Sequence, residues 1–134
     1  MKKLGFKALV GVLAAVFALG MTACDSGNEK SSTYEQITTE QAKTIMDAEK
    51  DYIIIDARTE EEFAEGHIEN AILIPEYEIA NRAEKELPDK EQLILVYCRS
   101  GRRSKIASEE LVKLGYTNVK EFGGIIDWPY DIVK

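Results

Sequence analysis

Short apolar runs alternate with amphipathic stretches from residue 34 to residue 134. The runs that predict β-strands are 34–37, 51–56, 71–74, 93–97 and 118–121. The run at 51–56 is apolar at consecutive positions, which is typical of a strand covered on both faces. The run at 71–74 ends at Pro75, which cannot donate to a strand ladder.

Helix signals separate these runs. The segments Thr38–Gln41 and Thr59–Glu62 have the spacing of capping boxes, which begin helices, and Gly66 can end the second of those helices. Further helices are predicted at about 76–86 and 103–114. Strands that alternate with helices in this way predict an α/β fold with a mainly parallel sheet.

The first 23 residues have the order of a secretory signal. A basic stretch at 1–7 precedes an apolar stretch at 8–19, and small residues then lead to Cys24. Small residues before a cysteine resemble the lipobox of bacterial lipoproteins. This resemblance predicts removal of residues 1–23, lipid on Cys24, a flexible tether at 24–33 and an α/β domain at 34–134.

Two other interpretations of this segment stay open. The first is an uncleaved anchor helix, although the apolar stretch is short for a span of about 20 residues. The second is ordinary cleavage that leaves Cys24 as a free thiol. The lipoprotein interpretation places the domain at the extracytoplasmic face of a bacterial membrane, either periplasmic or outer, held there by its lipid.

Charge and composition exclude several functions. The chain has 134 residues, with 17 Lys and Arg against 24 Asp and Glu, and a net charge of −7. Without residues 1–23 the net charge becomes −10, which disfavours binding to nucleic acid. One His and two Cys cannot supply the four ligands of a structural zinc or iron-sulfur site, so no metal or cofactor is expected. We expect a monomer.

The candidate chemistry lies directly after the strand at 93–97. Ligands of parallel α/β sheets bind beyond the carboxyl ends of the strands, and Cys98 is the first residue past such an end. A thiol before a helix N-terminus and beside three arginines is favoured as a thiolate, and the same surroundings bind anions. The predicted active-site loop consists of Cys98, Arg99, Ser100, Gly101, Arg102, Arg103 and Ser104.

This loop resembles the active-site loop of single-domain rhodaneses, the thiosulfate and sulfane-sulfur transferases. Two further stretches resemble the same family in the right order. The upstream stretch includes Asp56-Ala57-Arg58, Gly66-His67-Ile68 and Ile74-Pro75, and the downstream stretch includes Gly123-Gly124-Ile125 with Trp128. Asn70 stands where the family usually has Gly, and Asn also tolerates positive φ.

The resemblance implies a rhodanese-like three-layer fold with a mainly parallel five-stranded sheet flanked by helices. It also implies a sulfurtransferase in which Cys98 carries a persulfide within a cradle of backbone N–H groups from Arg99 to Ser104. The sulfur donor would be thiosulfate or a related small molecule, and a thiol or another thiophile would accept the sulfur.

The surrounding charged residues are assigned narrower roles. Arg99 and Arg102 are expected to attract the dianionic donor. Arg103 should orient the loop by pairing with Glu62 or Asp56. We expect a structural ion pair between Asp56 and Arg58, and a packing and hydrogen-bonding role for His67.

Two alternatives remain for the function. Cysteine phosphatases and arsenate reductases place a thiolate before a helix in the same way, but their loops are similar to Cys-x5-Arg, whereas Arg103 closes Cys-x4-Arg. The loop also lacks a general acid to protonate an alkoxide. The second alternative is a module that binds or relays persulfide sulfur without turnover of its own.

Overall fold

The computed structural model describes residues 33–134, in which five parallel strands form one sheet. The sheet order is β1-β5-β4-β2-β3. The strands are β1 (Glu35–Gln36), β2 (Tyr52–Asp56), β3 (Ala71–Leu73), β4 (Leu93–Cys98) and β5 (Val119–Gly124). The predicted signal segment, Cys24 and the predicted tether up to residue 32 lie outside the described residues.

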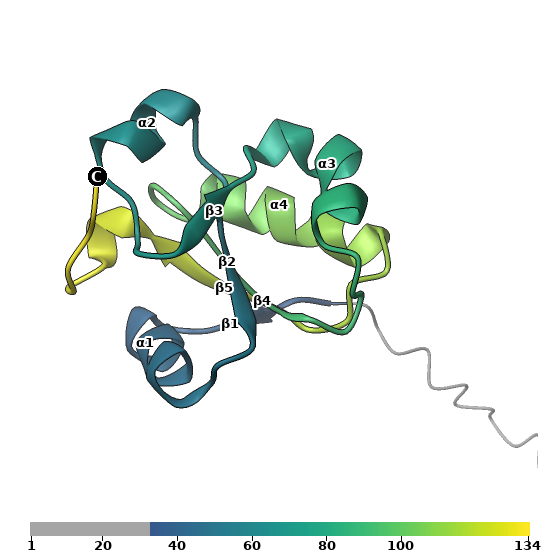
Figure 1. Cartoon of the computed structure of the whole chain (residues 1–134), viewed down its shortest axis with the longest axis horizontal. Coiled ribbons are helices and arrows are strands. Elements are labelled where there is room, and N and C mark those ends of the chain that lie inside the picture. Colours follow the sequence, from purple (N-terminus) through teal and green to yellow (C-terminus); the bar gives the residue numbers. More distant parts are fainter. Residues whose placement is uncertain (1–32) are drawn as a thin grey trace, which may run out of the picture.

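Helices cover both faces of this sheet, which gives the expected three layers (Figure 1). The helix α1 packs on one face, and α3 and α4 pack together on the other (Figure 1). The helices are α1 (Thr39–Ala48), α2 (Glu60–Glu65), α3 (Ile79–Glu86) and α4 (Arg102–Lys113), with 3-10 turns η1 (Glu76–Glu78) and η2 (Ile125–Asp127). The predicted fold is therefore confirmed.

Two elements differ from the sequence-based boundaries. The single helix expected at 76–86 begins as the turn η1, because Pro75 provides no side-chain cap for an α-helix there. The last strand continues past residue 121 to Gly124, which pairs with Cys98. Between the pairs Val96–Glu121 and Cys98–Gly124 the register shifts by one residue, so a bulge lies beside Cys98.

Each face of the sheet carries its own apolar core. Ile55 and Val96 point to the α3/α4 side, whereas Ile54 and Leu95 point to the α1 side. Consecutive residues of one strand are thus buried on opposite faces, as the unalternating apolar run predicts. Among residues 33–134, no helix has both the length and the apolar character needed to cross a membrane.

Glu62 connects the short helix α2 to α4. Its carboxylate accepts a hydrogen bond from Thr59 N at 3.0 Å, and its own N–H donates to Thr59 Oγ1 at 3.3 Å, which completes the predicted capping box. The Arg103 guanidinium donates two further hydrogen bonds to the Glu62 carboxylate, at 2.7 and 2.8 Å. The hydrogen bonds from Arg103, and then those from Thr59, lower the pKa of Glu62 to about 2.

The lowered pKa predicts a pH-dependent contribution of Glu62 to stability. The ionised carboxylate stabilises the fold fully above pH 4.5, its ordinary pKa, and this contribution is lost as pH falls towards 2. We expect Glu62→Gln to lower the free energy of unfolding at pH 7 by about 1 to 2 kcal/mol. The difference from wild type should shrink between pH 4.5 and pH 2, measured by urea denaturation at each pH.

The matched control is Glu61→Gln on the same helix. Glu61 is exposed and has no ion pair among residues 33–134, so its substitution should change stability by no more than about 0.5 kcal/mol. A Glu62→Gln deficit that stays constant from pH 7 to pH 2 would contradict the role of the ionised carboxylate.

Candidate active site

Cys98 lies at the carboxyl end of β4, the central strand of the sheet, and is 1% exposed. Its thiol is free, and its Sγ accepts a hydrogen bond from Gly101 N at 3.0 Å. The Sγ also lies 3.3 Å from Ser104 Oγ, to which the thiol can donate. The four residues from Cys98 to Gly101 therefore form a tight ring around the sulfur.

The N-terminus of α4 faces this ring. Gly101 caps the helix, and the first bond closed at its start runs from Lys105 N to Gly101 O at 3.3 Å. The N–H groups of residues 102–104 consequently have no acceptor within the helix, and they carry the positive end of its dipole. A negative sulfur or a bound anion is stabilised at such a helix end.

Two glycines allow the backbone to close around Cys98. Gly101 has φ of +106°, a conformation that L side chains rarely adopt. A Cβ atom on Gly124 would lie 2.0 Å from Arg99 O and 2.5 Å from Ser100 Cα, so only glycine lets β5 pass beneath the loop. The next turn then fastens the loop, because Ile126 N donates to Arg99 O at 3.2 Å.

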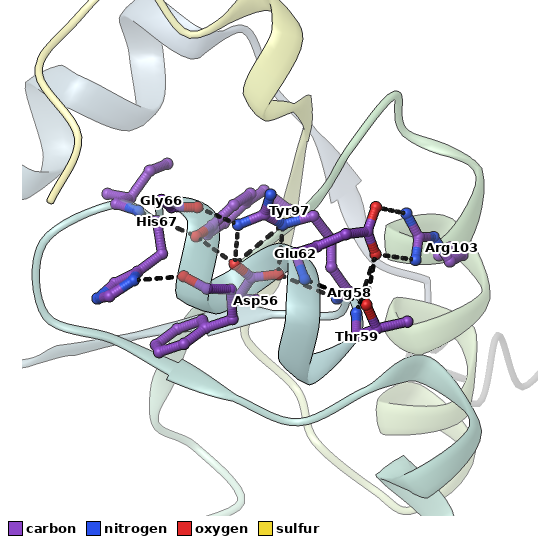
Figure 2. Close-up of polar contacts among 10 residues, drawn as sticks. Asp56, Arg58, Thr59, Glu62, Gly66, His67, Tyr97 and Arg103 are labelled. Atoms are coloured by element: carbon purple, nitrogen blue, oxygen red, sulfur yellow. Dashed lines mark hydrogen bonds and ion pairs between the residues drawn. The ribbon is translucent and has the colours of Figure 1, made fainter. Parts of the chain in front are cut away.

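The three loop arginines fall into two groups. Arg103 is half-buried and pairs with Glu62, one of the two carboxylates proposed for it from the sequence (Figure 2). The hydrogen bond to Glu62, and to a smaller extent the charge interactions with Glu62 and Cys98, raise the pKa of Arg103. Arg99 and Arg102 are exposed and have no ion pair within the described part of the chain.

Asp56 and Arg58 form the expected ion pair, and Tyr97 completes it (Figure 2). The Arg58 guanidinium donates to Asp56 Oδ2 at 2.7 Å and to Gly66 O at 2.6 Å, and Tyr97 OH donates to Asp56 Oδ2 at 2.6 Å. Burial lowers the pKa of Arg58, but the hydrogen bonds and charge of Asp56 outweigh it and raise the pKa. Burial and the Asp56 charge raise the pKa of Tyr97. This network holds the carboxyl end of β2 against Tyr97 of β4, the residue directly before Cys98.

His67 takes the packing role that was expected of it. Its ring stacks on Phe63 with centroids 3.7 Å apart, and its Nδ1 lies 2.9 Å from Phe63 O (Figure 2). The backbone of His67 exchanges two hydrogen bonds with Val133, both of 2.8 Å. No hydrogen bond joins His67 to Cys98 in the described residues.

Ser104 and Glu121 form a polar contact that the sequence reasoning missed. Ser104 was expected to contribute only its backbone N–H, but its Oγ lies between Cys98 Sγ at 3.3 Å and Glu121 Oε1 at 2.6 Å. Glu121 was regarded only as part of the last strand. The available signal was an acidic residue between the apolar Val119 and Phe122, directly before the Gly123-Gly124 pair.

A separate hollow of about 500 Å³ lies on the α1 side of the molecule. Trp128, Tyr130 and Lys43 line it, and none of the loop residues 98–104 does. Cys98 is also not part of any group of three His, Cys, Asp or Glu side chains suited to a metal within residues 33–134.

The chain has relatives whose names describe sulfur transfer. Thiosulfate sulfurtransferase PspE of Escherichia coli is 41% identical over 80 residues, which are 60% of this chain and 77% of the relative. A sulfurtransferase of Allochromatium vinosum is 36% identical over 94 residues, which are 69% of this chain and 86% of the relative. The chain covers only 22% of the adenylyltransferase and sulfurtransferase UBA4 of Candida albicans, a longer protein.

Solved structures show the same architecture. A rhodanese with anions from E. coli matches 62% of this chain and 98% of its own, with a TM-score of 0.59 and 38% identity. A rhodanese-related protein from Thermoplasma volcanium matches 75% of this chain and 98% of its own, with a TM-score of 0.64 and 32% identity. The sequence pattern of the rhodanese-like domain matches residues 38–129. The chain therefore belongs to the family of rhodanese-like domains.

Proposed function

We propose that this protein is a sulfurtransferase that moves sulfane sulfur from thiosulfate or a related donor to a thiophilic acceptor through a persulfide on Cys98. The observation that carries the proposal is the position of Cys98 Sγ, 3.0 Å from Gly101 N at the N-terminus of α4. The names of the relatives support the same reaction class.

The reaction has two balanced steps. In the first, the Cys98 thiolate attacks the outer sulfur of thiosulfate, and the bond between that sulfur and the sulfonate sulfur breaks. Sulfite leaves with the electron pair of that bond, and the enzyme holds a Cys98 persulfide anion. In the second step, a thiolate or cyanide attacks the outer persulfide sulfur and leaves Cys98 as a thiolate again.

The exposed arginines of the loop can assist the attack on thiosulfate. Arg99 and Arg102 are exposed without ion pairs in the described part of the chain, so their guanidiniums can attract a dianion. The N–H groups at residues 102–104 begin α4, and in the proposed reaction they would stabilise the negative charge that remains on the persulfide. Arg103, occupied by Glu62, holds the loop in place and does not compete for the donor.

Phosphoryl transfer is the competing reaction, and the size of the loop argues against it. Cys98 and Arg103 close a six-residue segment, and the N–H of Gly101 already contacts the sulfur at 3.0 Å. A ring this tight suits one extra sulfur atom better than the three equatorial oxygens of a phosphate. Sulfite is also a good leaving group that needs no general acid.

A persulfide relay without turnover is the other alternative. A relay module would use the same loop and would also accept one sulfur atom on Cys98. The two differ in the second step, because an enzyme turns over repeatedly with thiosulfate and a small thiophile, whereas a relay transfers its sulfur to a partner protein only.

The first test concerns Cys98 itself. We expect the full chain, incubated with thiosulfate, to gain the mass of one sulfur atom on the peptide that contains Cys98. Cys98→Ser should not gain this mass and should lose thiosulfate-to-cyanide transfer by at least about 10³-fold, because an alkoxide cannot form the persulfide. Its unfolding free energy should remain within about 1 kcal/mol of wild type. Transfer near the wild-type rate in Cys98→Ser would rule out the mechanism.

The second test concerns the size of the loop. Inserting one Gly between Gly101 and Arg102 restores Cys-x5-Arg spacing, and it moves the helix cap away from the sulfur. We expect the insertion to reduce sulfur transfer by at least about 100-fold, because the backbone donors no longer match the sulfur. The control is one Gly inserted in the exposed bend between Lys50 and Asp51. Faster hydrolysis of an aryl phosphate than sulfur transfer by the unaltered protein would favour the phosphatase alternative.

We further propose that the domain acts at the extracytoplasmic face of a bacterial membrane through a lipid on Cys24. The support is the residue pattern alone: a basic stretch, an apolar stretch and small residues before Cys24. A lipid anchor would leave the sulfur site on a domain joined to the membrane by the predicted tether.

A test of the anchor compares membrane association in cells. We expect the native chain to sediment with membranes and to carry lipid on Cys24, and Cys24→Ala to lose the lipid. Cys98→Ser serves as the control and should keep both properties. An unmodified Cys24, or a disulfide between Cys24 and Cys98, would contradict the anchor, and the disulfide would also contradict a free catalytic thiol.

A further inference from the structure

Glu121 is a buried acid in an apolar environment. Glu121 is 3% exposed. Its pairing partner on the adjacent strand β4 is Val96, which belongs to the core beneath α4. Val119, two residues earlier on the same face of β5, belongs to the same core. A carboxyl group at such a position is costly unless a cation or several donors compensate it.

No cation compensates Glu121 in the described part of the chain. The other buried acid in the described residues is Asp56, and it pairs with Arg58. Glu121 has two donors instead: Gly123 N at 2.8 Å and Ser104 Oγ at 2.6 Å, both directed at Oε1. A residue that breaks the burial rule in this way, next to a reactive group, indicates a functional requirement.

The Ser104 hydroxyl joins Glu121 to the reactive sulfur. Its Oγ lies 2.6 Å from Glu121 Oε1 and 3.3 Å from Cys98 Sγ, and it has one proton to donate. If this proton goes to the Glu121 carboxylate, the Ser104 oxygen accepts from the Cys98 thiol. If Glu121 holds a proton and donates it to Ser104, the hydroxyl donates to a Cys98 thiolate.

These two arrangements differ only in the positions of two protons. In the first, the thiol and a carboxylate are present, and in the second a thiolate and a carboxylic acid are present. The proton of the thiol moves to Ser104 while the proton of Ser104 moves to Glu121, so the net charge of the site stays constant. Cys98 is 1% exposed, and the Ser104 hydroxyl is the side-chain group within hydrogen-bond distance of its sulfur in the described residues.

We propose that Glu121 is a positioning residue that accepts the Cys98 proton through Ser104 and thereby supplies the thiolate for sulfur transfer. This inference rests on the proposed function and names the group that prepares the nucleophile for it. After the acceptor has removed the sulfur, the same path returns the proton to the Cys98 thiolate.

The other charged groups around the path lie on several helices and strands. Arg103 on α4 interacts with the Cys98 charge and is itself held by Glu62 of α2. Asp56 at the end of β2 is engaged by Arg58 and Tyr97. On the β1 side, Gln36 pairs with Glu121 in register, and Lys120 pairs with Glu35. Each of these charged groups already has a partner of opposite charge within the described residues.

The experiment measures the rate of Cys98 alkylation by iodoacetamide between pH 4 and pH 10 on the full chain. Mass spectrometry of the Cys98 peptide separates this reaction from that of Cys24. Two coupled groups give two rises in the rate with a plateau between them, whereas an isolated thiol gives one rise. We expect two rises for the wild type and one for Glu121→Gln and for Ser104→Ala.

The rate near pH 6 gives the size of the effect. Glu121→Gln keeps the shape of the side chain but cannot accept the proton, so alkylation at that pH should fall by about tenfold. Glu109→Gln, at an exposed position of α4, should keep the wild-type profile. A single rise in the wild type, or an unchanged or faster rate in Glu121→Gln, overturns the proposal.

Two features of the experiment separate a failure of the proton path from a loss of fold and from a failure of the proposed function. Circular dichroism and urea denaturation of each variant show whether the fold is retained, and the wild-type profile decides the question even if Glu121→Gln does not fold. Alkylation needs no sulfur donor. If two rises appear but thiosulfate leaves no persulfide, the proton path is supported and the proposed function fails.

Discussion

The hydrogen bond from Gly101 N to Cys98 Sγ, 3.0 Å long, closes the ring on which the rest of the site depends. The ring requires a positive φ at Gly101 and a strand β5 that passes without a side chain at Gly124. It also requires α4 to begin at Arg102, since the free N–H groups of the first turn must face the sulfur. The surroundings of the Cys98 sulfur are therefore set first by the backbone.

Ion pairs divide the arginines around the ring into a paired group and an exposed group. The chain is acidic, and its buried or half-buried carboxylates hold Arg58 and Arg103 in fixed positions. Arg99 and Arg102 remain on the surface without such partners in the described residues. Arg103 thus ties α2 to the loop and Arg58 ties the end of β2 to Gly66, whereas Arg99 and Arg102 are exposed to solvent.

The sequence allowed the fold and the loop to be predicted because both depend on local signals. The capping boxes at Thr38 and Thr59 and the apolar run at 51–56 give the alternation of elements, and Cys98 follows a strand end directly. Asn70 has the positive φ, of 66°, that its place in the pattern suggested. The partner of Arg103 could be narrowed only to Glu62 or Asp56, because residues as far apart in sequence as Arg103 and Glu62 meet only in the folded chain.

Two contacts that could not be predicted depend on the register between strands. Glu121 faces α4 because β5 pairs with β4 in a register that sets it opposite Val96, and the bulge then brings Gly123 N to its carboxylate. Tyr97 reaches Asp56 for the same reason, since its strand β4 lies beside β2. A one-residue change of register would direct either side chain to the other face of the sheet. Local sequence patterns do not contain that information.

Two glutamates near Cys98 illustrate how the surroundings of an acid decide its use. Glu62 accepts two hydrogen bonds from Arg103, which keep its pKa near 2 and its charge constant at neutral pH. A carboxylate fixed in this way is suited to hold an arginine and unsuited to receive a proton. Glu121 has no cation within the described residues, and its only side-chain donor is a hydroxyl that can reverse its direction. The same residue type therefore serves as an anchor at position 62 and, in our proposal, as a proton acceptor at position 121.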